Sequence, residues 1–364
     1  MRIVQILHEE QRARASIVKG GSQWIGHGRK HTLAGVRIAL VCPAPPGSRL
    51  GNRITALRWR RMLHGLGHRV TIVQPGAAPA VDAVFALHAR RSAESVRLSR
   101  ELRPETAIVV VLTGTDLYRD VRTDPSAKRS LELADRLVVL HDGAPAELPR
   151  QMRSKVRVVP QSAPPMRRLP PLRRWFEVAV VAHLRPEKDP LRAARAARAL
   201  DARTRVRVVH AGAALSRTMR EEARAEMRSN PRYVWLGELP AWKARRLIAR
   251  SRVLCITSAM EGGANVLSEA IAAGTPVIAS RIPAMAAILG ADYPGFFPFG
   301  DTAALAALLR RAEREPRFLA ELRRGCVQVR PRVAPARERL ALRSLLAELR
   351  GPSSTFSFAG AGRR

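Results

Sequence analysis

The sequence predicts an α/β protein with two doubly wound parallel-sheet domains. Short apolar strands alternate with helical stretches along the chain, which is typical of parallel sheets that helices cover on both faces. A length of 364 residues leaves room for two such domains, and the hydrophobic share of 46% excludes general disorder. Two Pro-Pro pairs, 164–165 and 170–171, indicate an extended linker between the halves.

Each half contributes one series of strands and helices. In the first half we expect strands at 36–42, 70–73, 83–87, 107–112, 137–140 and 156–159, and helices at 52–66, 92–101, 126–134 and 143–150. In the second half we expect strands at 177–182, 206–210, 233–236, 253–257 and 276–279, and helices near 190–200, 216–228, 241–250, 265–273, 302–313 and 316–325. This division predicts an N-terminal domain over 36–163 and a C-terminal domain over 164–335. Since open parallel sheets bind ligands at the carboxyl ends of their strands, we expect an active site in the cleft between them.

The chain ends and the cysteines limit the possible classes of protein. Residues 1–35 are polar and basic and lack an apolar signal-peptide core, so we expect a flexible extension there, and a disordered tail over 351–364. No apolar run approaches 18 residues, which predicts no membrane span. The three cysteines, at 42, 255 and 326, are far apart and show no metal-binding spacing, so a cytoplasmic protein is expected.

The net charge of +34 resembles that of a nucleic-acid-binding protein, but its distribution argues against that class. Only six of the 64 basic residues are lysines, and the arginines recur throughout the chain without forming a single stripe. Aromatic residues make up only 4%, too few for a base-stacking platform. We therefore expect no specific nucleic-acid partner, although such a charge favours anionic ligands through long-range steering.

The most informative segment is Glu261-Gly-Gly-Ala-Asn-Val-Leu-Ser-Glu269, in which two carboxylates bracket a glycine pair that opens a helix. Free N–H groups at a helix N-terminus bind phosphate oxygens, and glycines allow a ligand to approach the backbone closely. Carboxylates accept hydrogen bonds from sugar hydroxyls. These features suit a nucleotide sugar, with Glu269 on the ribose and Glu261 on the hexose. The predicted donor-binding residues are Glu261, Gly262, Gly263, Ala264, Asn265 and Glu269; Asn265 also suits the helix N-cap.

This segment resembles the E-x7-E motif of retaining GT-B glycosyltransferases, the family that includes sucrose and glycogen synthase-like enzymes. Upstream, His183-Leu-Arg185-Pro-Glu-Lys188-Asp-Pro is similar to that family's G-R-L-x-x-E-K-G segment. A narrower set of motifs, in order along residues 36–350, resembles the selenosugar synthases of selenoneine biosynthesis. These motifs begin at Pro43, Leu87, Thr113, Gly237 and Asp292.

The resemblance implies roles for the cations that follow strand 177–182. Arg185 and Lys188 would neutralise the diphosphate and stabilise it as the leaving group, which makes them candidate catalytic residues. The chain departs from the family pattern at His183 and Asp189, where the family usually has glycine, so the shape of this loop is expected to differ.

The acceptor is expected on the N-terminal domain, where three loops follow the first, third and fourth strands. A small phosphate-like acceptor needs several cationic groups. The predicted acceptor-binding residues are Gly47, Arg49, Asn52, Arg53, Arg90, Arg91, Thr113 and Asp116. His88 is a candidate acid–base catalyst and equally a hydrogen-bonded structural histidine. Related transferases often have a histidine where Thr113 stands. Its absence here weakens the expectation, drawn from the resemblance, of a catalytic histidine.

The resemblance implies a GT-B enzyme that moves a hexosyl group from a UDP-sugar to selenophosphate and forms a C–Se bond. It implies no cofactor and no metal, and the sequence shows no Asp-x-Asp pair. It also implies that the last strong helix, 336–349, crosses back onto the N-terminal domain. One alternative is a related transferase with an alcohol or lipid acceptor, for which helix 52–66 with Trp59 could resemble a membrane patch. The other is a basic nucleic-acid-binding or scaffold protein without activity.

Overall fold

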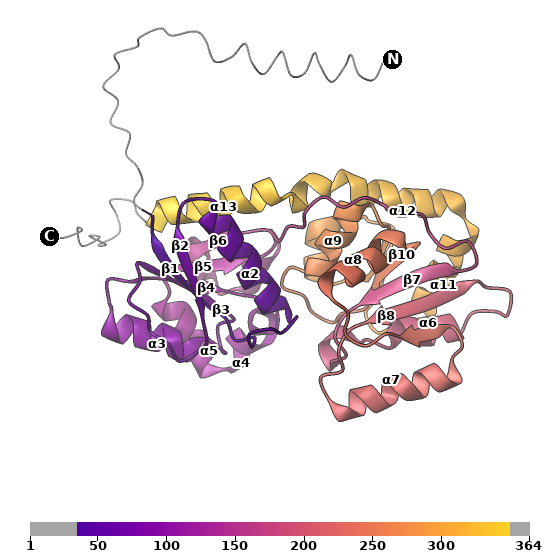
Figure 1. Cartoon of the computed structure of the whole chain (residues 1–364), viewed down its shortest axis with the longest axis horizontal. Coiled ribbons are helices and arrows are strands. Elements are labelled where there is room, and N and C mark those ends of the chain that lie inside the picture. Colours follow the sequence, from indigo (N-terminus) through magenta and orange to yellow (C-terminus); the bar gives the residue numbers. More distant parts are fainter. Residues whose placement is uncertain (1–34, 350–364) are drawn as a thin grey trace, which may run out of the picture. The chain divides into compact units, whose positions relative to one another are not determined.

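The computed structural model describes residues 35–349, so the expected terminal extension and tail lie outside the described residues, apart from residue 35. The first of two parallel sheets has the strand order β2-β1-β3-β4-β5-β6 (Figure 1). Its strands are β1 (Arg37–Val41), β2 (Arg69–Val73), β3 (Ala83–Leu87), β4 (Ala107–Val111), β5 (Arg136–Val139) and β6 (Val156–Val158). Because β1 lies between β2 and β3, the chain reverses its direction of winding there, which is where such sheets bind ligands.

Alternate side chains of the first sheet enter two separate cores. Leu40 and Phe85 lie in the core that also holds residues of α2 and α13, whereas Val41 and Val84 lie in the core on the opposite face. Both faces are therefore apolar, which explains the continuous apolar strands. The helices are α2 (Gly51–His64), α3 (Ala93–Leu102), α4 (Val121–Thr123) and α5 (Pro125–Leu133), with a π-helical turn at Asp116–Asp120.

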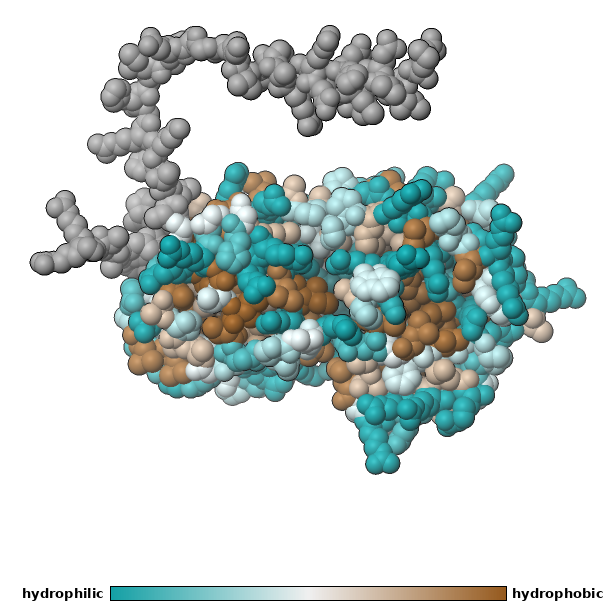
Figure 2. All heavy atoms as spheres, in the orientation of Figure 1, coloured by the Kyte–Doolittle hydropathy of each residue, from teal (hydrophilic) through white to brown (hydrophobic). Residues whose placement is uncertain are grey.

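The second sheet is also parallel, with the strand order β12-β11-β10-β7-β8-β9. Its strands are β7 (Phe176–Val181), β8 (Val206–Ala211), β9 (Tyr233–Trp235), β10 (Val253–Ile256), β11 (Val277–Ser280) and β12 (Phe296–Phe297). Its helices are α6 (Arg192–Arg198), α7 (Arg217–Ser229), α8 (Ala241–Arg250), α9 (Asn265–Ala273), α10 (Pro283–Leu289), α11 (Thr302–Arg314) and α12 (Pro316–Gln328). The arginine-rich α7 buries only Ala223 and Glu226, and Figure 2 shows it as a hydrophilic surface below the second domain.

The two doubly wound sheets confirm the predicted fold class, and the segment between them, 161–172, has neither helix nor strand. The expected helix at 143–150 is wrong. Two short 3-10 helices, Ala144–Glu147 and Arg150–Lys155, stand there, because Pro149 lacks an N–H and disfavours a helical conformation at Leu148. The sequence analysis also missed α10 and β12, which span only seven and two residues.

The final helix, α13 (Pro335–Leu349), packs on the N-terminal domain beside α2 (Figure 1). Leu342, Leu345, Leu346 and Leu349 are buried in the core under α2. Trp59 of α2 is fully buried, and its Nε1 donates to Glu338 of α13 at 2.7 Å. Trp59 therefore does not contribute to the membrane patch for which helix 52–66 could be mistaken. Within the described part of the chain, no helix has the length and apolar character that crossing a membrane requires.

Candidate active site

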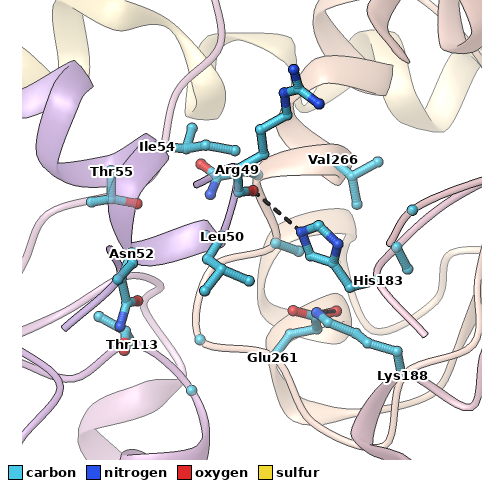
Figure 3. Close-up of a pocket in the computed structure, with 18 of the residues that line it drawn as sticks. Arg49, Leu50, Asn52, Ile54, Thr55, Thr113, His183, Lys188, Glu261 and Val266 are labelled. Carbon is cyan, nitrogen blue, oxygen red and sulfur yellow. Dashed lines mark hydrogen bonds and ion pairs between the residues drawn. The ribbon is translucent and has the colours of Figure 1, made fainter. Parts of the chain in front are cut away.

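A cavity of about 540 Å³ is lined by residues that follow strands of both sheets. From the first sheet come the loops after β1, β3, β4 and β6, and from the second the loops after β7, β8, β9 and β10. Its volume lies in the range of small-molecule binding sites. The carboxyl ends of parallel strands and the N-termini of α2 and α9 thus meet in one pocket (Figure 3).

The N-terminus of α9 opens onto this pocket. Ala264, which precedes the helix, has a left-handed backbone with φ of 46°, and no side chain caps the helix. Ala264, Asn265 and Val266 all line the pocket, so the first N–H groups of α9 are available to an anion. The prediction of Asn265 as N-cap is wrong, because it is the first helical residue. Its Oδ1 accepts from Arg58 Nη1 at 2.7 Å.

The two predicted donor carboxylates both line the pocket and both have cationic partners. Glu261 is only 6% exposed, and its Oε1 accepts from Lys188 Nζ and from Ser258 Oγ, each at 2.5 Å. Glu269 accepts from Arg245 Nε at 2.9 Å. Figure 3 shows the Lys188 and Glu261 side chains meeting inside the pocket. Lys188 therefore holds Glu261 in place, a contact that the sequence analysis did not foresee.

Arg185 is a second cation at this side of the pocket. It follows β7 and lines the cavity. Its Nε is buried and has no hydrogen-bond partner among residues 35–349. A buried guanidinium N–H without an acceptor is costly, so this group is suited to an anionic ligand.

The predicted glycine pair has a structural reason that the sequence did not reveal. A Cβ on Gly262 would lie 2.2 Å from the carbonyl oxygen of Thr113, in the loop after β4. A Cβ on Gly263 would lie 2.8 Å from atoms of Gln161 and Leu140. Both residues line the pocket, so the absent side chains let the loop after β10 pack closely against the N-terminal domain as well as against a ligand.

His88 lines the pocket from the loop after β3, with an unusual backbone φ of 74°. Its Nδ1 is 3.4 Å from the Arg91 backbone N–H, and its Nε2 is 3.0 Å from Thr115 Oγ1. Burial lowers the pKa of His88, although the nearby Asp116 carboxylate opposes this shift. The ring is therefore neutral at pH 7. The accepting Nδ1 places the proton on Nε2, which donates to Thr115.

Asp116, a predicted acceptor-binding residue, is fully buried and does not line the pocket. Its carboxylate accepts from the backbone N–H groups of Ala89 at 3.0 Å, Thr113 at 2.9 Å and Gly114 at 2.8 Å. These bonds join the loop after β3 to the loop after β4. Asp116 therefore fixes the backbone of two loops of the site, and its own side chain does not line the pocket where the acceptor is expected.

The other predicted acceptor residues divide into two groups. Arg49, Asn52, Arg91 and Thr113 line the pocket, whereas Gly47, Arg53 and Arg90 do not. Arg90 Nε donates to Asp120 at 3.0 Å, and Arg49 Nη1 lies 3.3 Å from a Glu238 carboxylate oxygen. The structure thus brings two of the four predicted arginines into the pocket.

His183, one of the departures from the family pattern, bridges the loops after β1 and β7. Its Nδ1 accepts from the Ala213 N–H at 3.1 Å, and its Nε2 lies 3.3 Å from the Arg49 carbonyl oxygen, as the dashed line in Figure 3 shows. Burial lowers the pKa of His183, so the ring is neutral and donates through Nε2. Other pocket residues that the sequence analysis did not assign are Thr115 and Gln161. Thr115 stands in the motif that begins at Thr113, whereas Gln161 stands in no motif, and only the tertiary structure places it here.

No group of three or more His, Cys, Asp or Glu residues that could hold a metal ion is found within residues 35–349. The three cysteines are free and buried. Burial raises the pKa of the Cys255 thiol to about 12 and that of Cys326 to about 11. These thiols are therefore protonated and serve packing.

Comparisons with known proteins agree with this architecture. Residues 174–328, in the C-terminal domain, match the family model described as "Glycosyl transferases group 1". No curated protein sequence matches the chain.

Similar solved structures share the two-domain GT-B fold. Sucrose-phosphate synthase from Thermosynechococcus elongatus is 16% identical with a TM-score of 0.70, over 86% of this chain and 99% of that one. Anabaena HepE, in complex with UDP and glucose, is 13% identical with a TM-score of 0.69, over 86% of this chain and 100% of that one. A UDP-forming α,α-trehalose-phosphate synthase from Burkholderia vietnamiensis is 16% identical with a TM-score of 0.61, over 82% of this chain and 80% of that one.

Proposed function

We propose that this protein is a glycosyltransferase that moves a hexosyl group from a UDP-sugar to selenophosphate. The observation that carries the donor assignment is the open N-terminus of α9, which shares one pocket with Glu261, Glu269 and Arg185. The helix N-terminus and Arg185 suit a diphosphate, and the carboxylates suit sugar hydroxyls. The group 1 family match and the UDP-bound structures of HepE support the choice of donor.

The acceptor assignment rests on the N-terminal side of the pocket and on the resemblance to selenosugar synthases. Arg49 and Arg91 line this side, together with Asn52 and Thr113. Two arginines can neutralise a small dianion next to the donor. Because selenophosphate is compact, it needs only a polar, cationic recess. The alternative of a lipid acceptor is less favoured, because the buried Trp59 leaves no aromatic anchor on α2 for a lipid.

The reaction needs little proton transfer. A selenium lone pair of selenophosphate attacks the anomeric carbon, a C–Se bond forms, and the C–O bond to the diphosphate breaks, so that UDP leaves with the bonding electrons. The protein contributes by holding two anions together, since proximity and orientation lower such barriers by about 7–11 kcal/mol. Arg185 and the α9 N-terminus stabilise the charge that develops on the diphosphate. Neutral His88 orients Thr115 at the acceptor side.

Product analysis tests this proposal. The protein is incubated with a panel of UDP-hexoses and selenophosphate, and the products are examined by mass spectrometry for the isotope pattern of selenium. We expect a hexose with a C–Se bond and stoichiometric UDP. Thiophosphate and simple alcohols serve as competing acceptors. Transfer to an alcohol without a selenium product would overturn the acceptor assignment and keep the donor assignment, and failure to consume any UDP-hexose would overturn both.

A further inference from the structure

Helices α12 and α13 each leave one face exposed along the same edge of the molecule. They lie in one row, with α12 along the second domain and α13 along the first, and a short 3-10 helix, Arg330–Val333, joins them (Figure 1). The α12 residues Phe318, Leu322 and Cys326 are buried, as are the leucines of α13 described above. Because the body of the protein lies on the same side of both helices, their outer faces both point away from it (Figure 1). We call these two outer faces together the basic edge.

Exposed arginines make this edge strongly positive. They are Arg317, Arg323 and Arg324 on α12, and Arg337, Arg339 and Arg343 on α13. Among these arginines, only Arg337 lies within 4.0 Å of a carboxylate of residues 35–349, at 3.7 Å from Asp142. Of the acidic residues on the two helices, Glu321 is exposed, Glu338 is buried and Glu348 is half-buried. The positive charge of the basic edge is therefore largely uncompensated.

The exposed helix α7 shows that exposed arginines alone do not produce such a surface. Arg220, Arg224 and Arg228 are exposed there, but so are Glu221 and Glu222 on the same helix. Glu221 also accepts from Arg217 Nε at 2.8 Å. Charges of alternating sign along a helix are typical of a face that only meets solvent. The excess of one sign therefore distinguishes the basic edge from α7.

Apolar side chains lie between the arginines of the basic edge. With about 3.6 residues per turn, Leu340 and Val327 lie on the sides of α13 and α12 opposite the buried residues. Leu340 is 52% exposed and Val327 is 44% exposed. The same outer faces carry the exposed Ala320, Ala336 and Ala347. Around the helix axis, Arg337 and Arg343 lie on either side of Leu340. An apolar centre with basic flanks is typical of a helix that lies in a membrane interface.

The surface of an anionic bilayer complements these features better than a nucleic acid does. A cluster of about four to eight basic residues on a helical surface binds anionic lipid headgroups. A duplex nucleic acid also pairs with arginines, but it gains nothing from the exposed Leu340 and Val327 among them. A bilayer buries these apolar side chains, while the long arginine side chains reach the lipid phosphates.

We propose that the basic edge binds the surface of an anionic lipid bilayer. Leu340 and Val327 enter the headgroup region, and the arginines beside them pair with lipid phosphates. The contact is peripheral, and it is independent of the proposed transfer reaction, because none of these residues lines the pocket.

Co-sedimentation of the full chain with vesicles tests the proposal. The vesicles contain phosphatidylcholine and phosphatidylglycerol in equal amounts, and pure phosphatidylcholine vesicles are the reference. The wild type should bind the anionic vesicles alone, and more weakly when salt is raised from about 0.1 M to about 1 M. The triple variant Arg324→Gln, Arg339→Gln and Arg343→Gln should bind them about tenfold or more weakly.

Two further variants separate a defined surface from the general charge of the protein. The α7 variant Arg220→Gln, Arg224→Gln and Arg228→Gln loses the same three charges and should stay within about twofold of the wild type. The double variant Leu340→Ser and Val327→Ser keeps every charge and should bind about threefold or more weakly, because the apolar centre is lost. All the substituted residues are exposed, so circular dichroism should be unchanged in each variant.

Four results would overturn the proposal. The first is a wild type that does not bind anionic vesicles, and the second is an equal loss in the α12–α13 and α7 triple variants, which would show attraction by net charge alone. The third is unchanged binding in the Leu340 and Val327 variant. The fourth is a loss of duplex DNA binding in the α12–α13 triple variant while its vesicle binding is unchanged, which would assign the edge to a nucleic acid. None of these measurements depends on transferase activity, so their failure leaves the proposed function intact.

Discussion

Replacing Glu338 by leucine should destabilise the N-terminal domain more than any exposed substitution on the same helix. Glu338 has no exposed surface and accepts from Arg58 Nε at 3.0 and 2.9 Å, from Trp59 Nε1 at 2.7 Å and from the Ser162 N–H at 3.1 Å. The Ser162 hydroxyl also donates to it. The carboxylate therefore joins α13, α2 and the segment between the domains.

The expected magnitude follows from what the variant leaves behind. Arg58 is only 9% exposed, so removing Glu338 leaves a buried guanidinium without its carboxylate. Breaking a buried ion pair from one side costs about 3–5 kcal/mol. Since about 1 kcal/mol shifts the melting temperature of a domain of this size by about 2–4 °C, the N-terminal transition should fall by about 6–20 °C.

The assay is differential scanning calorimetry of Glu338→Leu beside Glu348→Leu. Glu348 lies on the same helix and also pairs with two arginines, Arg136 and Arg157, but its side chain is 35% exposed. Such exposed pairs contribute about 0–1 kcal/mol, so this control should lose at most a few degrees. The double variant with Arg58→Met should recover part of the loss, because the unpaired charge is gone. Equal melting temperatures for the two glutamate variants would refute the reasoning.

Three other predictions follow from the site and the buried histidines. Arg185→Ala should lower kcat/KM by about 100-fold or more without a change in circular dichroism, because the leaving diphosphate loses a cation. Lys188→Ala should also reduce turnover, because it frees the Glu261 carboxylate. Near-normal kinetics in both variants would contradict the donor assignment. Gly262→Ala should abolish turnover, since its Cβ would overlap the loop after β4, whereas Gly51→Ala meets only an ordinary contact at 3.9 Å and should remain active. Burial lowers the pKa of His210 to about 4, below its usual 6.5. As the pH falls from about 6.5 to 4, this histidine is therefore protonated in the unfolded chain before it is protonated in the folded one, and the free energy of unfolding decreases. Urea unfolding should show a shallower loss over this range in His210→Asn, and an unchanged slope would exclude this histidine as a cause.

Local sequence patterns were enough to predict the fold class and most elements. The apolar strands match β1, β3 and β10 within one residue at each end, because strands buried on both faces must be apolar throughout. The segment from Glu261 to Gly274 was predicted as a loop and a helix, and α9 ends at Gly274 with the left-handed backbone that glycine allows. The pattern predicted one helix at 143–150, but Pro149 interrupts it, and two short 3-10 helices form there.

The contacts of individual site residues could not be predicted, since they depend on residues far away in the chain. Arg90 and Asp116 look like ligand-binding residues in their motifs, yet their partners are Asp120 and the backbone of two loops. Lys188 has the spacing of a phosphate ligand, but the fold places it on Glu261, 73 positions away. A short-range pattern carries no information about such pairs.

The sequence by itself determined that two parallel sheets form and that a helix preceded by a glycine pair follows β10, because periodicity, glycines and strand composition are local properties. Only the tertiary structure decided which polar groups share the cavity. It brought Gln161 against Gly263 and Thr55, and it buried Glu338 on Arg58, 280 positions away. The physical reason is that most buried polar atoms pair with the group that packing brings beside them, however far away that group lies in the sequence.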